Sequence, residues 1–379
     1  MLAIGATCLT GAPAVFAQDD PARFARVHGA LVLSGGGARG AYEAGWIEGL
    51  RRAGSVPDGV PLPGIDVVCG SSIGSINAWY VATAQYSQLA QVWRGIGQAN
   101  IFRLKRRYAA TANPHAFLLT KIIQSLSLAR GLTTNVQGIL DGPAIAQWID
   151  TNLDLRTPLV MPLIFTTTNL DRQRPELFYR LPPGLPSAPP GVILARVREA
   201  VGEDVPVRFA DDVLFGPAIR ASTAIPVLFD PVTLRSREDT LDRYVDGGIS
   251  DDSPIDIGRA LAVNVYLLLC DPATAKRERY ANALEIAVGA FGVAQQRIFD
   301  ASLRATVAAI KEKRLFEQSL PADVRRRTVA DVLDTNIFLG RPEHELAVQI
   351  AELDRQEKID AAYALGVADA ANGWQQYHF

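Results

Sequence analysis

The fold is decided by residues 29–40, which read GALVLSGGGARG. The first half is a short apolar run bounded by glycine, and such a run predicts a buried strand. The second half is rich in glycine, and residues 41–53 then place apolar side chains at helical spacing. The stretch therefore predicts a strand, a tight glycine turn and a helix, in that order.

A second unit of the same kind occupies residues 65–84, with a strand at 65–69, a turn at Gly70–Gly74 and a helix of small residues at 75–84. Two strand–turn–helix units in tandem predict an α/β fold, with a parallel-rich central sheet and helices on both faces. Further strands are expected at 159–167, 227–234 and 263–270, and further helices at 144–152, 216–221, 284–311 and 349–371.

The composition is that of a globular protein, since 48% of the 379 residues are hydrophobic and 21% are charged. We expect one α/β domain over residues 28–258 and a C-terminal continuation over residues 259–379, mostly helical, packed on the same domain. Residues 181–206 are rich in proline and glycine and are expected to form a long surface excursion. Lys and Arg number 38 against 40 Asp and Glu, so nucleic acid is not expected as a partner. The spacing of the three cysteines fits no zinc motif, and no metal is predicted.

The N-terminus resembles an export signal. Residues 2–17 carry no charge, and Val15 and Ala17 fit the two small-residue positions of a signal-peptidase site. This pattern predicts a signal peptide over residues 1–17 and a periplasmic or secreted protein. No Lys or Arg lies near Met1, so the alternative is a disordered or loosely packed N-terminal extension on a cytoplasmic or peripheral membrane protein.

The turn Gly70–Gly74 has the pattern G-x-S-x-G between a predicted strand and a predicted helix. In this setting the pattern is a nucleophile elbow, which projects the hydroxyl of Ser72 above the sheet. Gly70 and Gly74 have no Cβ, so the strand and the helix can cross closely. The N-terminus of the following helix favours negative charge at the site. Ser72 is therefore the predicted nucleophile, and the alternative is a purely structural turn.

The glycine run after the first strand can stabilise an oxyanion. Acyl transfer needs N–H donors aimed at the negative oxygen of the tetrahedral intermediate, and a run of glycines exposes main-chain N–H groups. Gly37 and Ala38 are the donors that we expect, and the Arg39 side chain either fixes the loop or favours an anionic lipid. The predicted oxyanion loop consists of Gly35, Gly36, Gly37, Ala38, Arg39 and Gly40.

A serine nucleophile needs a base. None of the four histidines lies in a glycine-rich or strand-end setting: His28, His115, His344 and His378. Asp246 is the better choice, because it follows the short run 241–245 and precedes Gly247 and Gly248. Asp251 and Asp252 are nearby rivals that could instead cap the next segment. A carboxylate that acts directly on serine needs a pKa raised by burial.

The same glycine run also satisfies the dinucleotide fingerprint G-x-G-x-x-G, so an NAD(P)-binding oxidoreductase is a rival interpretation. That fold expects an acidic residue at the end of the second strand, about twenty residues on. Asp58 lies in a loop, Asp66 lies near the start of a strand, and the second strand leads to the serine turn instead. A non-catalytic lipid-binding protein is a further alternative.

Together the motifs resemble the patatin-like phospholipases from about residue 30 to about residue 254. The glycine loop, the serine elbow and the Asp-Gly-Gly triplet at 246–248 occur in the order found in that family. Residues 74–78 and 218–226 also resemble family segments. Beyond Pro254 the similarity is loose.

The resemblance implies a Ser72–Asp246 dyad with the glycine loop as the oxyanion hole, and neither a metal nor a cofactor. It implies a phospholipid or other lipid ester as substrate. Asp252 departs from the family, in which many members carry asparagine at this place. Residues 101–132 mix apolar side chains with the basic Lys105, Arg106 and Arg107. This mixture fits an amphipathic cap that contacts a membrane surface and equally fits ordinary core helices.

Overall fold

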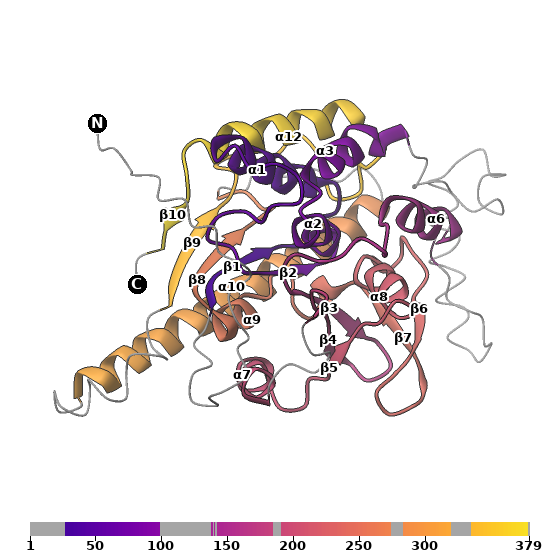
Figure 1. Ribbon diagram of the computed structural model, residues 1–379. Coiled ribbons are helices and arrows are strands. Elements are labelled where there is room, and N and C mark those ends of the chain that lie inside the picture. The colour runs from indigo at the N-terminus through magenta and orange to yellow at the C-terminus, as the bar shows by residue number, and fades with distance from the viewer. Residues whose placement is uncertain are drawn as a thin grey trace.

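A computed structural model describes residues 27–98, 138, 140, 142–184, 191–273, 283–319 and 335–377. The strands are β1 (Val27–Leu33), β2 (Val67–Ser71), β3 (Leu163–Asn169), β4 (Arg174–Arg180), β5 (Val207–Phe209), β6 (Val232–Arg235), β7 (Leu241–Val245), β8 (Ala262–Leu268), β9 (Asn336–Gly340) and β10 (Gln375–Gln376). In the described part of the chain they form one 10-stranded sheet in the order β10-β9-β8-β1-β2-β3-β4-β5, with β7 also on β3 and β6 on β7 (Figure 1).

The centre of the sheet is parallel. β9, β8, β1, β2 and β3 are neighbours and run in one direction, whereas β4 and β7 are antiparallel to β3. Leu33 at the end of β1 pairs with Gly70 of β2 and with Leu268 of β8. Carboxyl ends of parallel neighbours meet at one edge, so the glycine run after β1 and the serine turn after β2 must lie together.

Helices cover both faces of the sheet (Figure 1). The α-helices are α1 (Gly40–Ala53), α2 (Ile73–Ala82), α3 (Tyr86–Gly95), α6 (Gly142–Asn152), α7 (Gly191–Val201), α8 (Phe215–Ser222), α9 (Ile255–Leu261), α10 (Ala283–Ser319) and α12 (Gln356–Ala370). Short 3-10 turns are η2 (Gly37–Arg39), η3 (Ile96–Gln98) and η4 (Gly247–Ile249). One core lies between the sheet and α1, α2, α3, α8 and α12, and a second core lies between the sheet and α7, α9 and α10.

The alternation of side chains in β1 explains these two cores. Leu31 and Leu33 belong to the core under α1 and α2, and Ala30 and Val32 belong to the opposite core. Successive side chains of a strand point to opposite faces, and a strand buried on both sides is therefore apolar throughout. The continuous apolar run of β1 thus reflects helices on both faces.

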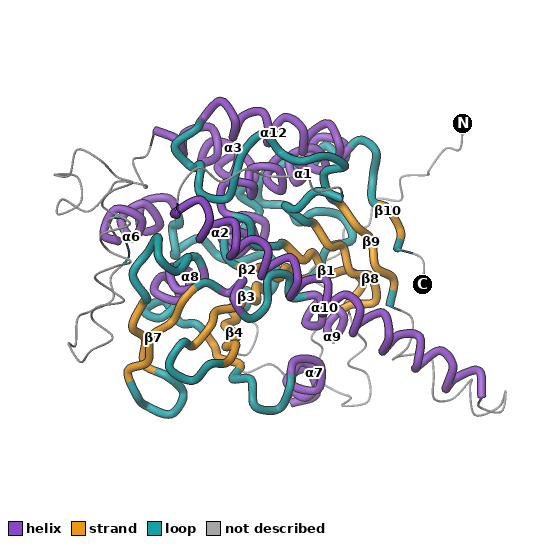
Figure 2. Tube along the Cα trace, turned by 180° about the vertical axis from the view of Figure 1, so that it is seen from behind, coloured by secondary structure: helices purple, strands orange, loops and turns teal. Residues whose placement is uncertain are grey.

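The C-terminal third is part of the same fold. β8 was expected, but β9 and β10 were not, and both extend the sheet. α10 crosses the back of the sheet and continues beyond it (Figure 2). α12 packs on α1, where the Tyr42 hydroxyl donates to the Asp369 carboxylate at 2.9 Å. The C-terminal continuation is therefore helical, as predicted, and it also contributes strands.

Three predicted elements differ from the structure in kind or by most of a turn or strand, besides smaller shifts such as β3 beginning at Leu163 and α10 ending at Ser319. The helix expected at 349–371 begins only at Gln356, and residues 349–355 form turns. The stretch 181–206 contains α7, which packs on α9, and is not only a surface excursion. The strand expected at 227–234 is limited to β6, because Val227 has a φ of 72°, which a strand cannot contain.

Several predictions fall outside the described residues: the signal peptide at 1–17, the amphipathic segment 101–132 with its basic cluster, Cys8, His115 and His378. Among the helices that the structure does describe, none combines the length and the apolar character needed to cross a membrane.

Candidate active site

The predicted serine elbow forms between β2 and α2. Ser72 has a φ of 51° and a ψ of −127°, a conformation that L-residues seldom adopt. A Cβ on Gly74 would lie 2.5 Å from the carbonyl oxygens of Leu33 and Ser34. Only glycine permits this approach of α2 to the end of β1, so the sequence G-x-S-x-G is required by local geometry. The turn places Ser72 at the carboxyl edge of the sheet.

Ser72 and Asp246 meet at this edge. The Ser72 hydroxyl donates a hydrogen bond to Asp246 Oδ2 at 2.6 Å, across 174 positions of sequence. β7 delivers the aspartate, because Val245 pairs with Thr168 of β3. Gly248 N–H donates to Asp246 Oδ1 at 2.8 Å, and the Thr168 hydroxyl donates to the Asp246 carbonyl at 2.9 Å. The carboxylate is thus held in one orientation, with one oxygen accepting from the Ser72 hydroxyl.

The environment of Asp246 suits a base. Its side chain is fully buried, and this burial raises the pKa of the carboxyl group from 3.8 to about 7. The hydrogen bonds from Ser72 and Gly248 lower the pKa, but their effect is smaller than that of burial. A carboxylate with a pKa near neutrality is a much stronger base than one at 3.8, and it still carries charge in a large fraction of molecules at neutral pH. The buried carboxylate therefore has the proton affinity that attack by serine needs.

Neither of the two rival residues, Asp251 and Asp252, accepts a hydrogen bond from the Ser72 hydroxyl. Asp252 Oδ1 accepts from Gln295 Nε2 at 2.8 Å, and the Asp251 carbonyl accepts from the Ser71 hydroxyl at 2.7 Å. Burial raises the pKa of Asp251 to about 7, and burial, together with the charges of neighbouring carboxylates, raises the pKa of Asp252 well above 3.8. Both carboxyl groups are therefore neutral over a wider pH range than usual, and geometry favours Asp246 as the base.

Hydrogen bonds through the hydroxyl groups of Ser71, Thr166 and Ser222 connect the elbow to α8 and β3. Ser72 N–H donates to the Ser222 hydroxyl at 3.1 Å, and that hydroxyl donates to the Thr166 carbonyl at 2.7 Å. The Thr166 hydroxyl donates to Ser71 Oγ at 2.9 Å. A Cβ on Gly247 would lie 2.7 Å from the Ser71 hydroxyl oxygen, so the Asp-Gly-Gly turn packs directly on these hydroxyl groups. Ser222 was not among the predicted site residues, although it lies in segment 218–226, which resembles a segment of the family.

The glycine loop offers fewer N–H donors than its sequence indicates. Gly35 N–H donates to the Asp252 carbonyl, and Ala38 N–H donates to the Ile350 carbonyl, both at 2.9 Å. The prediction of Ala38 as an oxyanion donor is therefore wrong in this structure, because a segment distant in sequence already occupies its N–H. Gly36 and Gly37 N–H have no protein partner among the described residues. They remain the donors of this loop that can face a substrate.

Arg39 fixes the loop. Its guanidinium forms an ion pair with Asp271 at 2.8 Å and donates to the Gln349 side-chain carbonyl at 2.7 Å. Of the two roles considered from the sequence, these contacts favour the structural one. Ile73 N–H, at the first turn of α2, also has no partner within the described part of the chain. Gly37 and Ile73 both line the pocket that Ser72 lines, and neither N–H has a protein partner in that part of the chain.

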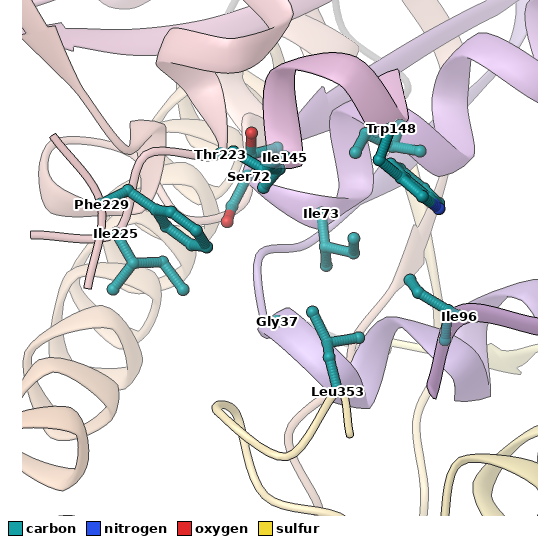
Figure 3. Close-up of a pocket in the computed structure, with 11 residues that line it drawn as sticks. Gly37, Ser72, Ile73, Ile96, Ile145, Trp148, Thr223, Ile225, Phe229 and Leu353 are labelled. Carbon is teal, nitrogen blue, oxygen red and sulfur yellow. The ribbon is translucent and has the colours of Figure 1, made fainter. Parts of the chain in front are cut away.

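An apolar pocket opens beside Ser72. The space within it and at its open mouth, solvent included, is about 400 Å³. Figure 3 shows Ile225 and Phe229 on one side of Ser72, and Ile73 and Trp148 on the other. Aliphatic and aromatic walls of this kind exclude water and accept hydrocarbon. The pocket suits the apolar part of an ester whose carbonyl carbon lies at Ser72.

The described histidines offer no alternative base. His28 lies at the start of β1, on the edge of the sheet opposite to Ser72, where it contacts the Gly64 carbonyl and Asn264. His344 follows β9 and forms no hydrogen bond with Ser72 or Asp246. Among the described residues, no group of three or more His, Cys, Asp or Glu side chains has the arrangement of a metal site.

Comparison with known proteins adds a family match. A family model described as Patatin-like phospholipase matches residues 31–258, more than half of the chain. The crystal structure of VipD from Legionella pneumophila is similar at 13% sequence identity and a TM-score of 0.34, and the match covers 93% of this chain and 68% of that chain. Full-length SpcU in complex with full-length ExoU, from the type III secretion system of Pseudomonas aeruginosa, is similar at 15% identity and a TM-score of 0.23, over 94% of this chain and 55% of the matched chain. No curated protein matches the sequence.

Proposed function

Because the chain belongs to the patatin-like phospholipase family, we propose that it is a serine lipid acyl hydrolase that cleaves carboxylic esters of lipids, as a phospholipase A or a lysophospholipase does. The hydrogen bond of 2.6 Å from the Ser72 hydroxyl to the buried Asp246 carboxylate is the observation that carries this proposal. The apolar pocket beside Ser72 supports a substrate with a hydrocarbon chain.

In the acylation step, Ser72 Oγ attacks the ester carbonyl carbon while its proton moves to Asp246 Oδ2. The carbonyl oxygen becomes an oxyanion and accepts hydrogen bonds from Gly37 and Ile73 N–H. Each such donor contributes about a hundredfold or more to the rate. The intermediate collapses when the bond to the alcohol breaks, and the alcohol takes the proton from Asp246. The acyl group remains on Ser72.

In the deacylation step, Asp246 accepts a proton from water, and the resulting hydroxide attacks the acyl carbonyl carbon. The same N–H groups stabilise the second oxyanion. The bond to Ser72 Oγ then breaks, the serine regains its proton from Asp246, and the fatty acid leaves. No step requires a histidine, because one buried carboxylate accepts and returns both protons.

Lipid substrates would reach the pocket from a membrane surface, so we infer a peripheral membrane contact. Export to the periplasm or beyond is a further proposal, which rests on residues 2–17 alone. Cleavage at Ala17 would be tested by determining the N-terminal residue of the chain recovered from the cell envelope and medium.

The proposed hydrolysis is tested with a medium-chain p-nitrophenyl ester and with phosphatidylcholine vesicles. We expect the wild type to release p-nitrophenol and fatty acid, and Ser72→Ala to lose about a thousandfold or more in rate while its fold persists. Ser87→Ala, an exposed serine on α3, is the matched control and should keep its activity. If Ser72→Ala retains the wild-type rate, the nucleophile is wrong.

The same experiment separates the alternative functions. A wild type that binds vesicles but releases no fatty acid would favour a non-catalytic lipid-binding protein. A wild type that is inert on every ester and gains thermal stability from NAD(P) would favour the dinucleotide interpretation of the glycine loop.

A further inference from the structure

The family match ends at residue 258, yet a later segment reaches the active site. Residues 349–353 follow β9 and precede α12. They contact both the glycine loop and the apolar pocket, because Ile350 meets Ala38 and Leu353 lines the pocket with Ser72. The site is therefore incomplete without a segment that the sequence motifs do not include.

The segment is held firmly against the glycine loop. The Ile350 carbonyl accepts from Ala38 N–H at 2.9 Å, and a Cβ on Gly37 would lie 2.2 Å from the same carbonyl oxygen. Arg39 donates to the Gln349 side chain at 2.7 Å. These contacts fix the position of the segment relative to the glycine loop.

The turn of the segment is also braced from within. Gln349 N–H donates to Glu352 Oε2 at 2.8 Å, and the Lys358 ammonium donates to Glu352 Oε1 at 2.7 Å. The Ile350 side chain packs in a small core with Ile225 and Phe229. These hydrogen bonds and this packing fix the conformation of the turn, and they therefore fix the position of Leu353.

Leu353 forms part of the pocket wall. Its side chain is only 8% exposed, and Figure 3 shows it directed toward Ile73, with Ile96 and Trp148 farther along the same side. An ester carbonyl whose oxygen faces Gly37 places its first carbons beside Ile73. A chain that continues along this wall lies against Leu353 and Ile96.

We propose that Leu353 is a specificity-determining residue that limits the length of the acyl chain, an inference that rests on the proposed hydrolase function. The substrate class is an ester of a fatty acid whose chain lies along Ile73, Leu353 and Ile96. Removal of the leucine side chain opens the pocket for longer chains, and a larger side chain closes it.

The test compares kcat/KM for p-nitrophenyl butyrate, octanoate and laurate, in one detergent at one concentration. Leu353→Ala should raise the laurate-to-butyrate ratio about tenfold, the discrimination that a few methylenes give in an apolar pocket. Leu353→Phe should lower that ratio about tenfold. Leu353→Val, which removes a single methylene, should shift the ratio in the direction of alanine and keeps the test valid if Leu353→Ala fails to fold.

Leu346→Ala is the matched control, because Leu346 is buried in the same region but does not line the pocket. It should lower stability and leave the laurate-to-butyrate ratio within twofold of the wild type. If the Leu353 variants leave the ratio unchanged while Ile225→Ala shifts it, the chain lies on the other side of Ser72 and the inference is overturned. If the wild type cleaves none of the three esters, the proposed hydrolase function fails before Leu353 is tested.

Discussion

Asp246→Asn should abolish activity and at the same time stabilise the protein. The wild-type carboxyl has a pKa of about 7 in the folded chain because it is buried, against 3.8 ordinarily. Between about pH 4 and pH 7 the folded state therefore holds a proton that the unfolded state releases. The free energy of unfolding falls as pH rises through this window, because ionisation in the folded state is disfavoured.

The magnitude follows from the shift. Burial raises the pKa of the Asp246 carboxyl from 3.8 to about 7, and each pKa unit corresponds to about 1.4 kcal/mol. Above pH 8 the charged carboxylate therefore lowers the free energy of unfolding by up to about 4 kcal/mol. Asparagine has nearly the same shape and no charge. Its oxygen can accept from Gly248 N–H, and its amide can donate to Ser72 Oγ, so both hydrogen-bonded positions stay filled. The lost proton acceptor should lower kcat/KM by about a hundredfold to ten-thousandfold.

The assay is urea unfolding followed by circular dichroism, together with ester hydrolysis, at pH 5 and pH 8. Asp246→Asn should be more stable than the wild type by about 2 kcal/mol at pH 5 and by about 4 kcal/mol at pH 8. Asp239→Asn, which alters an exposed carboxylate paired with Arg235, is the control and should change stability by less than about 1 kcal/mol. An inactive Asp246→Asn that is also less stable at pH 8 would refute the argument from burial, and an active one would refute the assignment of the base.

Three further predictions use the same assays. In the wild type, kcat/KM should rise as pH increases through about 7, because Asp246 accepts a proton only when it is charged; a pH–rate profile that is flat from pH 5 to pH 8 would contradict this. Gly74→Ala should lower stability by about 1–3 kcal/mol and reduce ester hydrolysis at least tenfold, because its Cβ would lie 2.5 Å from the Leu33 carbonyl oxygen; unchanged rate and stability would mean that the elbow tolerates a side chain. Glu43→Ala should lower the free energy of unfolding by about 3 kcal/mol, since it removes the carboxylate that accepts from one N–H of the buried Asn77 amide and from the buried Ser34 hydroxyl, while the Gly40 carbonyl still accepts from the Asn77 amide; a loss below about 1 kcal/mol in urea would count against the buried network.

β4 was not predicted from the sequence, because tertiary contacts satisfy a buried charge within it. β4 contains Glu176, a fully buried carboxylate that interrupts the apolar pattern expected of a strand. In the fold it pairs with Arg208 at 2.7 Å and accepts from the Tyr244 hydroxyl at 2.9 Å. Both partners are distant in sequence, so nothing in the local pattern shows that the charge is satisfied.

The same limit explains the error at residues 349–355. Apolar spacing there suggested a continuous helix, but the Ile350 carbonyl bonds to Ala38 N–H instead of to a helical partner. The contact also removes Ala38 from the set of oxyanion donors. Which N–H groups of a glycine loop are free depends on the segments that pack on it, and these cannot be read from the loop itself.

The local parts could be predicted from the sequence: the strand–turn–helix units, the requirement for glycine at Gly74, and the elbow that carries Ser72. Backbone conformation and close steric contact depend on a few consecutive residues, so a short motif specifies them. The folded chain was needed to show that the Ser72 hydroxyl donates to Asp246, that burial raises the pKa of Asp246, and that Leu353 lines the pocket. Hydrogen bonding and desolvation at the site depend on segments more than a hundred residues apart, which only the packed sheet and its helices bring together.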